Sequence, residues 1–599
     1  MKPLNVKRPS LKLKGIFPPQ TQPIIFAFII GILAALGNII LRFIVEGMEK
    51  HFLIPLETAA EGNISVRLLI IAVPVVGAIV LYAFVRAFKV KSVGYGFPFF
   101  LEKVNLKGAV IPFREIIEQI IGPAITLGFG GSAGLEGPSA RIGGGVGSVI
   151  GQYTGASGKR MKLFVASGSA AAIAANFNAP IAGVFFALEI VLVGEYELES
   201  LGAIVIASAM GTVMSRAVFA NHPIFDIPQY TMKNPIELLY YVGLGLFVAF
   251  FSVFFIKLFY GVQEWLDKFW KKMGIESLLA KLILGFLGVG IIGFFTPHVL
   301  GGGYFFIHKT LIGGISLWLL VALIFTKMIA TALTLNSGGM GGMFGPAIFI
   351  GAVVGGAYGG LLNLITHSAI SPGAYATVGF GAFLAALTHA PFTGIFLLFE
   401  MTGDYQIMVP AMIASVIGVI VAQILHPYSI DTHALAKKGI FLEAGKEVGV
   451  LGGIKVSDIV KPGFVPISPH TPLKEILRLV TETEFPYFPV INDKGELVGI
   501  VSLQDIRSVL LEGEELGNLV VAEDIATKDI ISVEPHDDLN KVLTKFAIKD
   551  LEALPVVTID KDGKKRLVGF VNRGDVIARY NQEILQKYSE AGGESGKEG

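Results

Sequence analysis

Residues 130–147 read Gly130-Gly-Ser-Ala-Gly-Leu-Glu-Gly-Pro-Ser-Ala-Arg-Ile-Gly-Gly-Gly-Val-Gly147. Glu136 is an ionisable side chain in an apolar, membrane-like region, where a functional role is the default interpretation. Gly137 and Pro138 break the chain and open a new helix, because proline fits the first helical turn. The positive end of that helix favours an anion, either a bound halide or the carboxylate of Glu136 itself. An acid that competes for an anion site predicts a gate; the alternative is a glycine-rich packing face with a paired acid.

A second run, residues 338–355, reads Gly338-Gly-Met-Gly-Gly-Met-Phe-Gly-Pro-Ala-Ile-Phe-Ile-Gly-Ala-Val-Val-Gly355 and keeps the glycines and the Gly-Pro step in register. Phe177–Glu189 and Thr388–Glu400 form another matching pair at nearly the same separation. Such self-similarity predicts a duplicated membrane unit. Interrupted segments at matching positions of two halves indicate the central site of a transporter. Glu136 of the first copy corresponds to Phe344 of the second, so only one copy carries an acid there.

The composition is that of an integral membrane protein. The 599 residues are 53% hydrophobic and 16% charged, with a mean hydropathy of +0.67. The chain contains no cysteine, which excludes disulfides, thiolate metal sites and cysteine nucleophiles. The ten histidines lack the spacing of metal ligands. We therefore expect no enzyme, no metal and no nucleic-acid partner.

A basic N-terminal arm precedes the first long apolar run, which begins at Pro23. Its charges are Lys2, Lys7, Arg8, Lys12 and Lys14. Positive charge beside a spanning helix predicts a cytoplasmic N-terminus. We expect a multi-pass protein of the cell membrane, in contact with the lipid bilayer, with a cytoplasmic C-terminus as well. A bacterial or archaeal plasma membrane is favoured, because no targeting segment precedes the run.

The character of the chain changes after Tyr428, where charged residues become frequent. Phe488–Asp505 matches Leu554–Asp575, and each predicts a strand, a turn, a second strand and a helix that begins near the aspartate. The expected boundaries are 1–20 for a cytoplasmic basic arm, 21–433 for the membrane domain with repeats at about 65–220 and 235–428, 434–453 for a linker, 454–513 and 520–583 for the two soluble repeats, and 584–599 for a disordered tail.

These motifs resemble a known family. In order, they are Gly94-Tyr-Gly-Phe-Pro98, Gly134-Leu-Glu-Gly-Pro138, Phe177-Asn-Ala-Pro180, Gly342-Met-Phe-Gly-Pro346 and Tyr428. The membrane region is similar to the CLC chloride channels and chloride/proton exchangers, and the tail is similar to a tandem pair of CBS domains. The resemblance implies an all-α polytopic membrane domain with inverted-topology repeats and broken helices, plus an α/β cytoplasmic CBS pair. It also implies a homodimer with one pore per subunit.

The resemblance further implies a chloride site, shared by similar monovalent anions, with Glu136 as its gate. The implied chloride-binding residues are Tyr95, Gly96, Phe97, Glu136, Gly137, Met343, Phe344 and Tyr428. Most contribute backbone N–H groups, and Tyr428 contributes a phenol hydroxyl. Tyr95 stands where the family usually has serine. Leu135 replaces a residue that is usually basic, and Arg141 either adds positive potential or pairs with an acid.

Ile190 bears on the transport mode. By the resemblance, proton-coupled members carry an internal acid at this position, and isoleucine cannot relay a proton. Passive, channel-like chloride conduction is therefore the favoured prediction. The alternative is a chloride/proton antiporter that uses another proton route, since some family exchangers lack this acid. Glu189, Glu195 and Glu197 are nearby acids, which are alternatively helix-end charges.

The resemblance to CBS domains suggests that an adenine nucleotide, such as ATP, ADP or AMP, regulates the protein. Ser502, Asp505 and Asp575 fit the pattern of its phosphate and ribose contacts, whereas Asn572 has replaced the second hydroxyl. The alternative for each aspartate is a helix N-cap without a ligand.

Two other classes are weaker alternatives. The run Gly155-Ala-Ser-Gly158 is similar to the serine motif of intramembrane proteases, but Lys159 and Arg160 follow at once and His389 belongs to the duplicated Ala-Pro break. A CBS-regulated divalent-cation channel would need converging acidic and carbonyl ligands, whereas helix N-termini repel cations.

Overall fold

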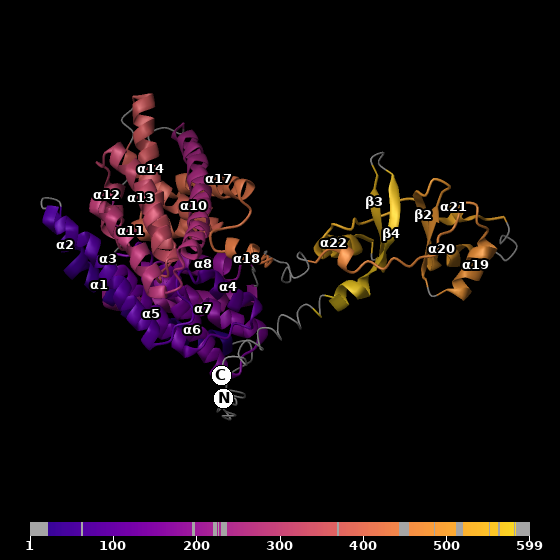
Figure 1. Cartoon of the computed structure of the whole chain (residues 1–599), viewed down its shortest axis with the longest axis horizontal. Coiled ribbons are helices and arrows are strands. Elements are labelled where there is room, and N and C mark those ends of the chain that lie inside the picture. Colours follow the sequence, from indigo (N-terminus) through magenta and orange to yellow (C-terminus); the bar gives the residue numbers. More distant parts are fainter. Residues whose placement is uncertain are drawn as a thin grey trace. The chain divides into compact units, whose positions relative to one another are not determined.

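The computed structural model describes residues 22–60, 64–194, 198–219, 224–225, 227–228, 230, 236–367, 371–442, 454–483, 485–510, 519–549, 551–560, 564–579 and 582. The chain forms two compact units that separate at Lys437, and each is described by itself (Figure 1). The predicted arm and tail, most of the predicted linker, and Glu195 and Glu197 lie outside the described residues.

The membrane unit is built from helices. They are α1 (Gln22–Met48), η1 (Glu49–Leu53), α2 (Ile54–Ala60), α3 (Ile64–Ala87), α4 (Phe97–Leu106), α5 (Phe113–Gly128), α6 (Glu136–Thr154), α7 (Gly158–Phe177), α8 (Pro180–Phe186), η2 (Ala187–Val191), α9 (Leu198–Phe219), α10 (Glu237–Met273), α11 (Leu278–Phe295), η3 (Pro297–Val299), α12 (Tyr304–Ile312), α13 (Leu317–Asn336), α14 (Phe344–Thr366), α15 (Pro372–Thr388), α16 (Pro391–Thr402), α17 (Met408–Leu425) and α18 (His433–Ala436). Among the described residues, eight helices are long and apolar enough to cross a membrane.

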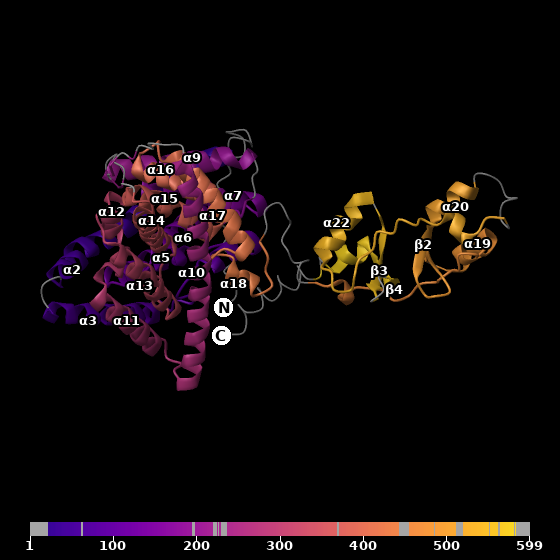
Figure 2. The same ribbon diagram turned by 90° about the horizontal axis from the view of Figure 1, so that it is seen from above.

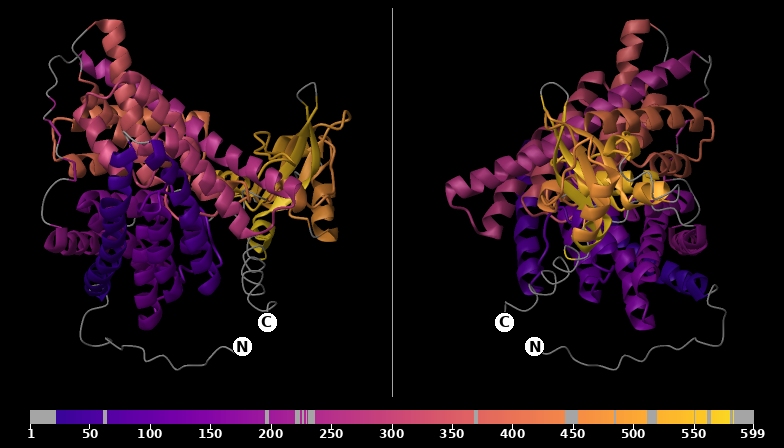
Figure 3. Two further views of the ribbon diagram at one scale, coloured as in Figure 1. Left: turned by 60° about the vertical axis from the view of Figure 1, so that its left-hand side comes forward. Right: turned by 90° about the vertical axis from the view of Figure 1, so that its right-hand side faces the viewer.

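The helix order repeats. The matched Gly-Pro runs begin α6 and α14, and the matched Ala-Pro runs begin α8 and α16. If the unbroken helical stretch of α1, η1 and α2 is taken as one element, counting outward from these anchors pairs it with α10 and pairs α9 with α17. The first copy of the repeat can therefore be followed back to Gln22, whereas the sequence predicts its start near residue 65. Helix α1 has no glycine-proline break that would mark it as part of the repeat in the sequence. Figure 3 separates the indigo-to-purple first half from the pink-to-orange second half.

Small residues let equivalent helices approach closely in each half. A β-carbon on Gly143 of α6 would lie 2.0 Å from the carbonyl oxygen of Gly168 in α7. At the equivalent contact, a β-carbon on Gly351 of α14 would lie 2.6 Å from the carbonyl oxygen of Gly379 in α15. Figure 2 shows α14 beside α15. Such packing is typical of membrane helices, and here it encloses the interrupted segments, whose free backbone groups cannot face lipid.

The C-terminal unit contains two similar α/β repeats. Its elements are η5 (Val456–Asp458), α19 (Leu473–Glu482), β1 (Tyr487–Ile491), β2 (Leu497–Ser502), α20 (Leu503–Leu510), α21 (Ala522–Ile525), α22 (Leu539–Lys549), β3 (Ala553–Ile559) and β4 (Lys565–Asn572). Strand β1 pairs antiparallel with β2, and β3 pairs antiparallel with β4. Both hairpins follow the strand–turn–strand prediction.

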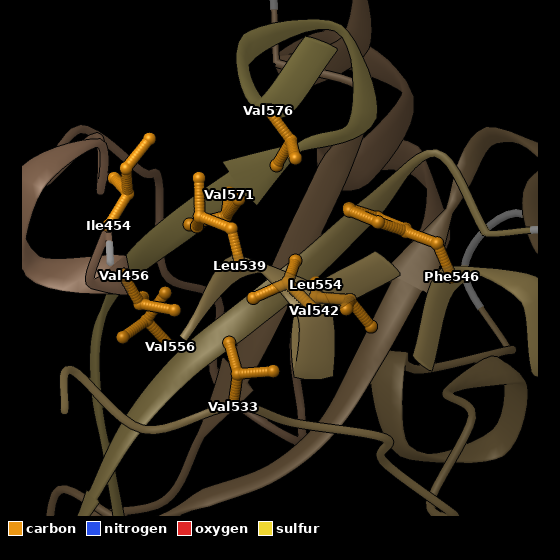
Figure 4. Packing of buried hydrophobic residues seen from close by; sticks show 10 residues of the cluster. All are labelled: Ile454, Val456, Val533, Leu539, Val542, Phe546, Leu554, Val556, Val571 and Val576. Atoms are coloured by element: carbon orange, nitrogen blue, oxygen red, sulfur yellow. The ribbon is translucent and has the colours of Figure 1, made fainter. Parts of the chain in front are cut away.

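The two soluble repeats exchange segments. Ile454 and Val456, at the start of the first predicted repeat, pack in the core formed by the second (Figure 4). Lys461 pairs with Phe570 of β4. Conversely, Ala522 packs in the core of the first repeat. Each hydrophobic core therefore contains residues from both predicted sequence ranges.

Candidate functional site

The two Gly-Pro breaks of the membrane unit cross each other. Gly134 and Gly342, which hold equivalent places in the two runs, exchange both backbone hydrogen bonds at 2.8 Å. A second pair of equivalent hydrogen bonds also joins the two halves. The Met340 amide donates to Thr126 Oγ1 at 3.0 Å, and the Ser132 amide donates to Thr334 Oγ1 at the same distance. The antiparallel pairing of equivalent residues fits an inverted repeat. It fixes the starts of α6 and α14 against each other.

Glu136 lies at this crossing. Its side chain is buried, with an exposed fraction of 0%. One carboxylate oxygen, Oε2, accepts the amide of Gly345 in the first turn of α14 at 2.9 Å. The other oxygen, Oε1, accepts a hydrogen bond from the hydroxyl of Tyr304. The carboxylate therefore occupies the positive N-terminus of α14, a position that suits an anion.

Helix α4 reaches the same region. Its N-cap is Gly96 and its first residue is Phe97. The ring of Phe186 from α8 lies 6.2 Å from the ring of Phe97 and 5.3 Å from the ring of Phe344. Arg141 of α6 lies against Gly96, where a β-carbon would sit 2.6 Å from its Nη1. The start of α4 thus contacts α6 through Arg141 and is linked to the start of α14 through Phe186.

The side chain of Tyr95 has a hydrogen-bond partner within the membrane unit. Its hydroxyl donates a hydrogen bond to Oδ1 of Asp431, which lies between α17 and α18. Asp431 is 2% exposed, and its Oδ2 has no hydrogen-bond partner in the described part of the chain. A buried carboxyl with one donor and no paired cation is costly in its charged form.

The remaining predicted anion ligands take different positions. Met343 is the N-cap of α14 and Phe344 its first residue, and both are buried. Gly137 lies in the first turn of α6. Tyr428 is half-buried in the segment after α17, with its carbonyl oxygen 2.7 Å from Nδ1 of His426. The contact of Tyr428 with an anion stays a prediction.

Ile190 is buried, with an exposed fraction of 4%, in the π-helical segment η2. The neighbouring acid Glu189 caps α16 by accepting the Phe392 and Thr393 amides at 3.1 and 2.7 Å. Its counterpart Glu400 caps α8 by accepting the Ile181 and Ala182 amides at 2.9 and 2.8 Å. The helix-end interpretation of Glu189 therefore fits its contacts, and the two halves cap one another.

Sequence reasoning missed Tyr304 and Asp431, which contact predicted site residues, and the buried Lys327. Lys327 of α13 is fully buried and donates to the carbonyl oxygens of Val299 and Gly301 at 2.9 and 3.0 Å. The sequence could have indicated Lys327, because a charged side chain within an apolar membrane helix usually has a function. Tyr304 and Asp431 carried no such local signal.

Comparison with known proteins bears on the membrane unit first. The family profile described as "Voltage gated chloride channel" matches residues 76–423, more than half of the chain. The chain belongs to this family. Two stretches of the CLC chain, 456–512 and 521–581, match the profile described as "CBS domain". The predicted fold class, a helical CLC membrane domain followed by an α/β CBS pair, is confirmed.

Some relatives of this CLC chain are named as channels and others as exchange transporters. It is 28% identical over 538 residues to "Chloride channel protein CLC-f" of Arabidopsis thaliana, covering 79% of this chain and 69% of the relative. It is 31% identical over 416 residues to "H(+)/Cl(-) exchange transporter ClcA" of Vibrio campbellii, covering 69% and 88%. The crystal structure of a eukaryotic CLC transporter superposes with a TM-score of 0.60 at 20% identity, over 92% of this chain and 97% of that one.

The predicted nucleotide contacts in the CBS pair are engaged within the chain. Oδ2 of Asp505 accepts both the amide and the hydroxyl of Ser502, at 2.8 and 2.6 Å, which caps α20. Asp575 Oδ1 pairs with Nζ of Lys461 at 2.8 Å, and its Oδ2 accepts from Asn572 at 3.1 Å. A ribose would have to displace Lys461 or Asn572 from Asp575. This geometry does not fit an open nucleotide site at the second repeat, and we derive no regulatory step from one.

Proposed function

We propose that this CLC protein transports chloride across a membrane through a pathway that Glu136 gates. One observation carries the proposal: the Glu136 carboxylate accepts the Gly345 amide at 2.9 Å, at the N-terminus of α14. A carboxylate in that place excludes a halide from the same donors. Once the carboxyl is protonated or displaced, the Gly345 amide becomes available to chloride.

The proposed anion path follows the converging helix starts. Backbone N–H groups of Gly96, Phe97, Gly137, Met343 and Phe344 and the hydroxyls of Tyr95 and Tyr428 are its proposed donors. Neutral donors of this kind bind a halide tightly enough for it to enter and loosely enough for it to leave. The Tyr95 hydroxyl would have to leave Asp431 to take part.

For the transport mode, Ile190 favours passive, channel-like conduction, because a buried isoleucine cannot carry a proton. The second candidate is chloride/proton exchange by another route. Asp431 favours it, since this buried carboxyl has one oxygen without a partner among the described residues and lies beside Tyr95 at the start of α4.

We propose cytoplasmic termini in the cell membrane. Helix α1 has 27 residues, or about 40 Å at 1.5 Å per residue, and therefore crosses the bilayer from the basic arm. Helix α3 returns to the side of the arm, where Arg86 and Lys89 lie at its end. Positive charge at these ends agrees with a cytoplasmic side.

A homodimer with one pore per subunit is part of the same proposal. Helices α8, α9, α16 and α17 carry exposed apolar side chains, including Ile181, Val205, Phe392 and Ile420. These residues face either lipid or a second copy. The mass of the purified protein in detergent, measured by light scattering, separates the two cases.

Paired chloride and proton flux in liposomes tests the function. Chloride efflux that becomes insensitive to pH in Glu136→Gln supports the gate; efflux of that variant with a normal pH response refutes it. Uphill proton movement driven by chloride identifies an exchanger, whereas chloride flux without it identifies a passive conductor. Magnesium selectivity without chloride flux, or peptide cleavage lost in Ser157→Ala, would replace the proposal with one of the two weaker classes.

A further inference from the structure

Tyr304 connects the gate to a second region of the molecule. It is the first residue of α12 and follows Gly303, whose left-handed φ of +75° suits glycine. Its hydroxyl contacts Oε1 of Glu136, whereas the Gly345 amide holds Oε2. The two oxygens of the gate carboxylate therefore face two different neighbours, one in the anion site and one in α12.

Tyr304 also lines a cavity of about 280 Å³. Glu46, Glu49, Lys50 and His298 are among the other lining residues. Glu46 and Lys50 are exposed and charged, and charged side chains favour water over lipid at the rim of the cavity. Tyr304 is half-buried and thus borders this cavity while its hydroxyl contacts the fully buried Glu136.

The cavity lies at the end of α1 that is remote from the basic arm. Glu46 belongs to the last turn of α1, and Glu49 begins the π-helical segment η1 directly after it. With the arm on the cytoplasmic side, as proposed above, this end of α1 faces the outside. The cavity thus gives external water a place beside the phenol, separate from the Gly345 amide that an anion would use.

We propose that Tyr304 has two roles, an inference that rests on the proposed Glu136 gate. Its hydroxyl holds the ionised Glu136 carboxylate in the closed position, and it transfers protons between Glu136 and the external cavity. A hydronium ion in the cavity gives a proton to the phenol oxygen while the hydroxyl proton moves to Oε1 of Glu136. The products are water, an unchanged tyrosine and a neutral carboxyl, so no other reactant is needed. The neutral carboxyl then releases the Gly345 amide.

The charged groups around this relay come from several elements. Arg42, Glu46 and Lys50 belong to the end of α1 and to η1, as does Glu49, which accepts the Gly302 amide at 3.1 Å. The short helix η3, which precedes α12, adds His298. From α13, the buried Lys327 faces Glu49. The acids near the cavity attract protons, and Lys327 opposes the charge of Glu49.

Tyr304→Phe tests the relay, because it removes the hydroxyl and keeps the ring. Chloride flux is measured in liposomes across external pH and after a rapid external pH step. Loss of a donor that stabilises the ionised carboxylate shifts the pH midpoint of flux upward by about one unit. Loss of the relay slows the response to the pH step on the order of tenfold or more.

Tyr230→Phe is the matched control, because its hydroxyl donates to the Leu311 carbonyl of α12 at 2.6 Å and does not contact Glu136. It is expected to behave as the wild type. Addition of Tyr304→Phe to Glu136→Gln is expected to change nothing further. A wild-type midpoint and response rate in Tyr304→Phe would overturn the relay while leaving the gate intact. A normal pH response in Glu136→Gln would overturn the gate itself.

Discussion

Gly134 and Glu136 lie so close that no side chain fits between them. A β-carbon on Gly134 would sit 2.3 Å from Oε2 of Glu136 and 2.6 Å from the Gly345 amide nitrogen. The glycine thus provides the space in which the Glu136 carboxylate reaches α14. The absence of a side chain at Gly134 therefore allows both the Gly134–Gly342 backbone pairing and the contact of Glu136 with the Gly345 amide.

Gly134→Ala is expected to displace the Glu136 carboxylate from the Gly345 amide. A contact of 2.3 Å cannot be accommodated without movement. Chloride flux at high pH, where the gate should be shut, is expected to rise several-fold relative to the wild type, and stability is expected to fall by about 1–3 kcal/mol. Gly202→Ala is the control, because a β-carbon there meets nothing within 4 Å. Equal high-pH flux in both variants would contradict the steric account.

Asp431→Asn addresses the transport mode. If Asp431 takes up protons from the cytoplasm during exchange, the asparagine variant is expected to keep its chloride flux. Its chloride-driven uphill proton flux is expected to fall tenfold or more. Asp267→Asn, at an exposed position of α10, is the control. A wild type with no uphill proton movement would instead leave passive conduction, and Asp431 would then act only as the acceptor for Tyr95.

The reciprocal caps predict losses of stability of similar size. Glu400→Ala removes the acceptor for two amides of α8, and Glu189→Ala removes the acceptor for two amides and the Thr393 hydroxyl of α16. Each is expected to cost about 0.5–2 kcal/mol, seen as a lower unfolding midpoint in detergent. The double variant is expected to lose about the sum, since the caps share no partner. Glu264→Ala, at an exposed ion pair with Lys437, is expected to change little. Midpoints unchanged by either cap variant would count against the caps.

Lys461 forms an ion pair with Asp575 in the CBS pair. Lys461→Ala is expected to free the carboxylate and to strengthen binding of ATP, ADP or AMP to the full chain, as measured by calorimetry. Asp505→Asn is expected to weaken the same binding about tenfold through loss of a charged acceptor. No heat of binding in the wild type and in Lys461→Ala would leave both aspartates as structural residues.

The sequence predicted the parts of the site whose signals are local. Gly-Pro and Gly-x-Pro steps locate the starts of α4, α6 and α14, because proline and glycine act on their own stretch of backbone. Internal similarity predicted the two halves. Tyr304 and Asp431 were not predicted, because their partners, Glu136 and Tyr95, lie 168 and 336 positions away in the sequence. No local pattern marks either pairing.

Repeat boundaries were harder to predict for a different physical reason. Helix α1 joins the first half through packing, and an apolar helix without breaks looks the same whether or not it belongs to a repeat. In the soluble unit, Ile454 and Val456 pack into the core of the other repeat. Sequence similarity marks equivalent segments and does not reveal which copy each segment packs against.

The mutual capping of α8 and α16 has a consequence for synthesis. Ile181 receives its acceptor, Glu400, from a position 219 residues later in the chain. At 5–20 residues per second, the ribosome needs roughly 10 to 45 seconds to supply it. Throughout that interval the first helices are already in the bilayer while the start of α8 lacks this partner. The start of α8 therefore lacks this acceptor until about two thirds of the 599-residue chain has been made.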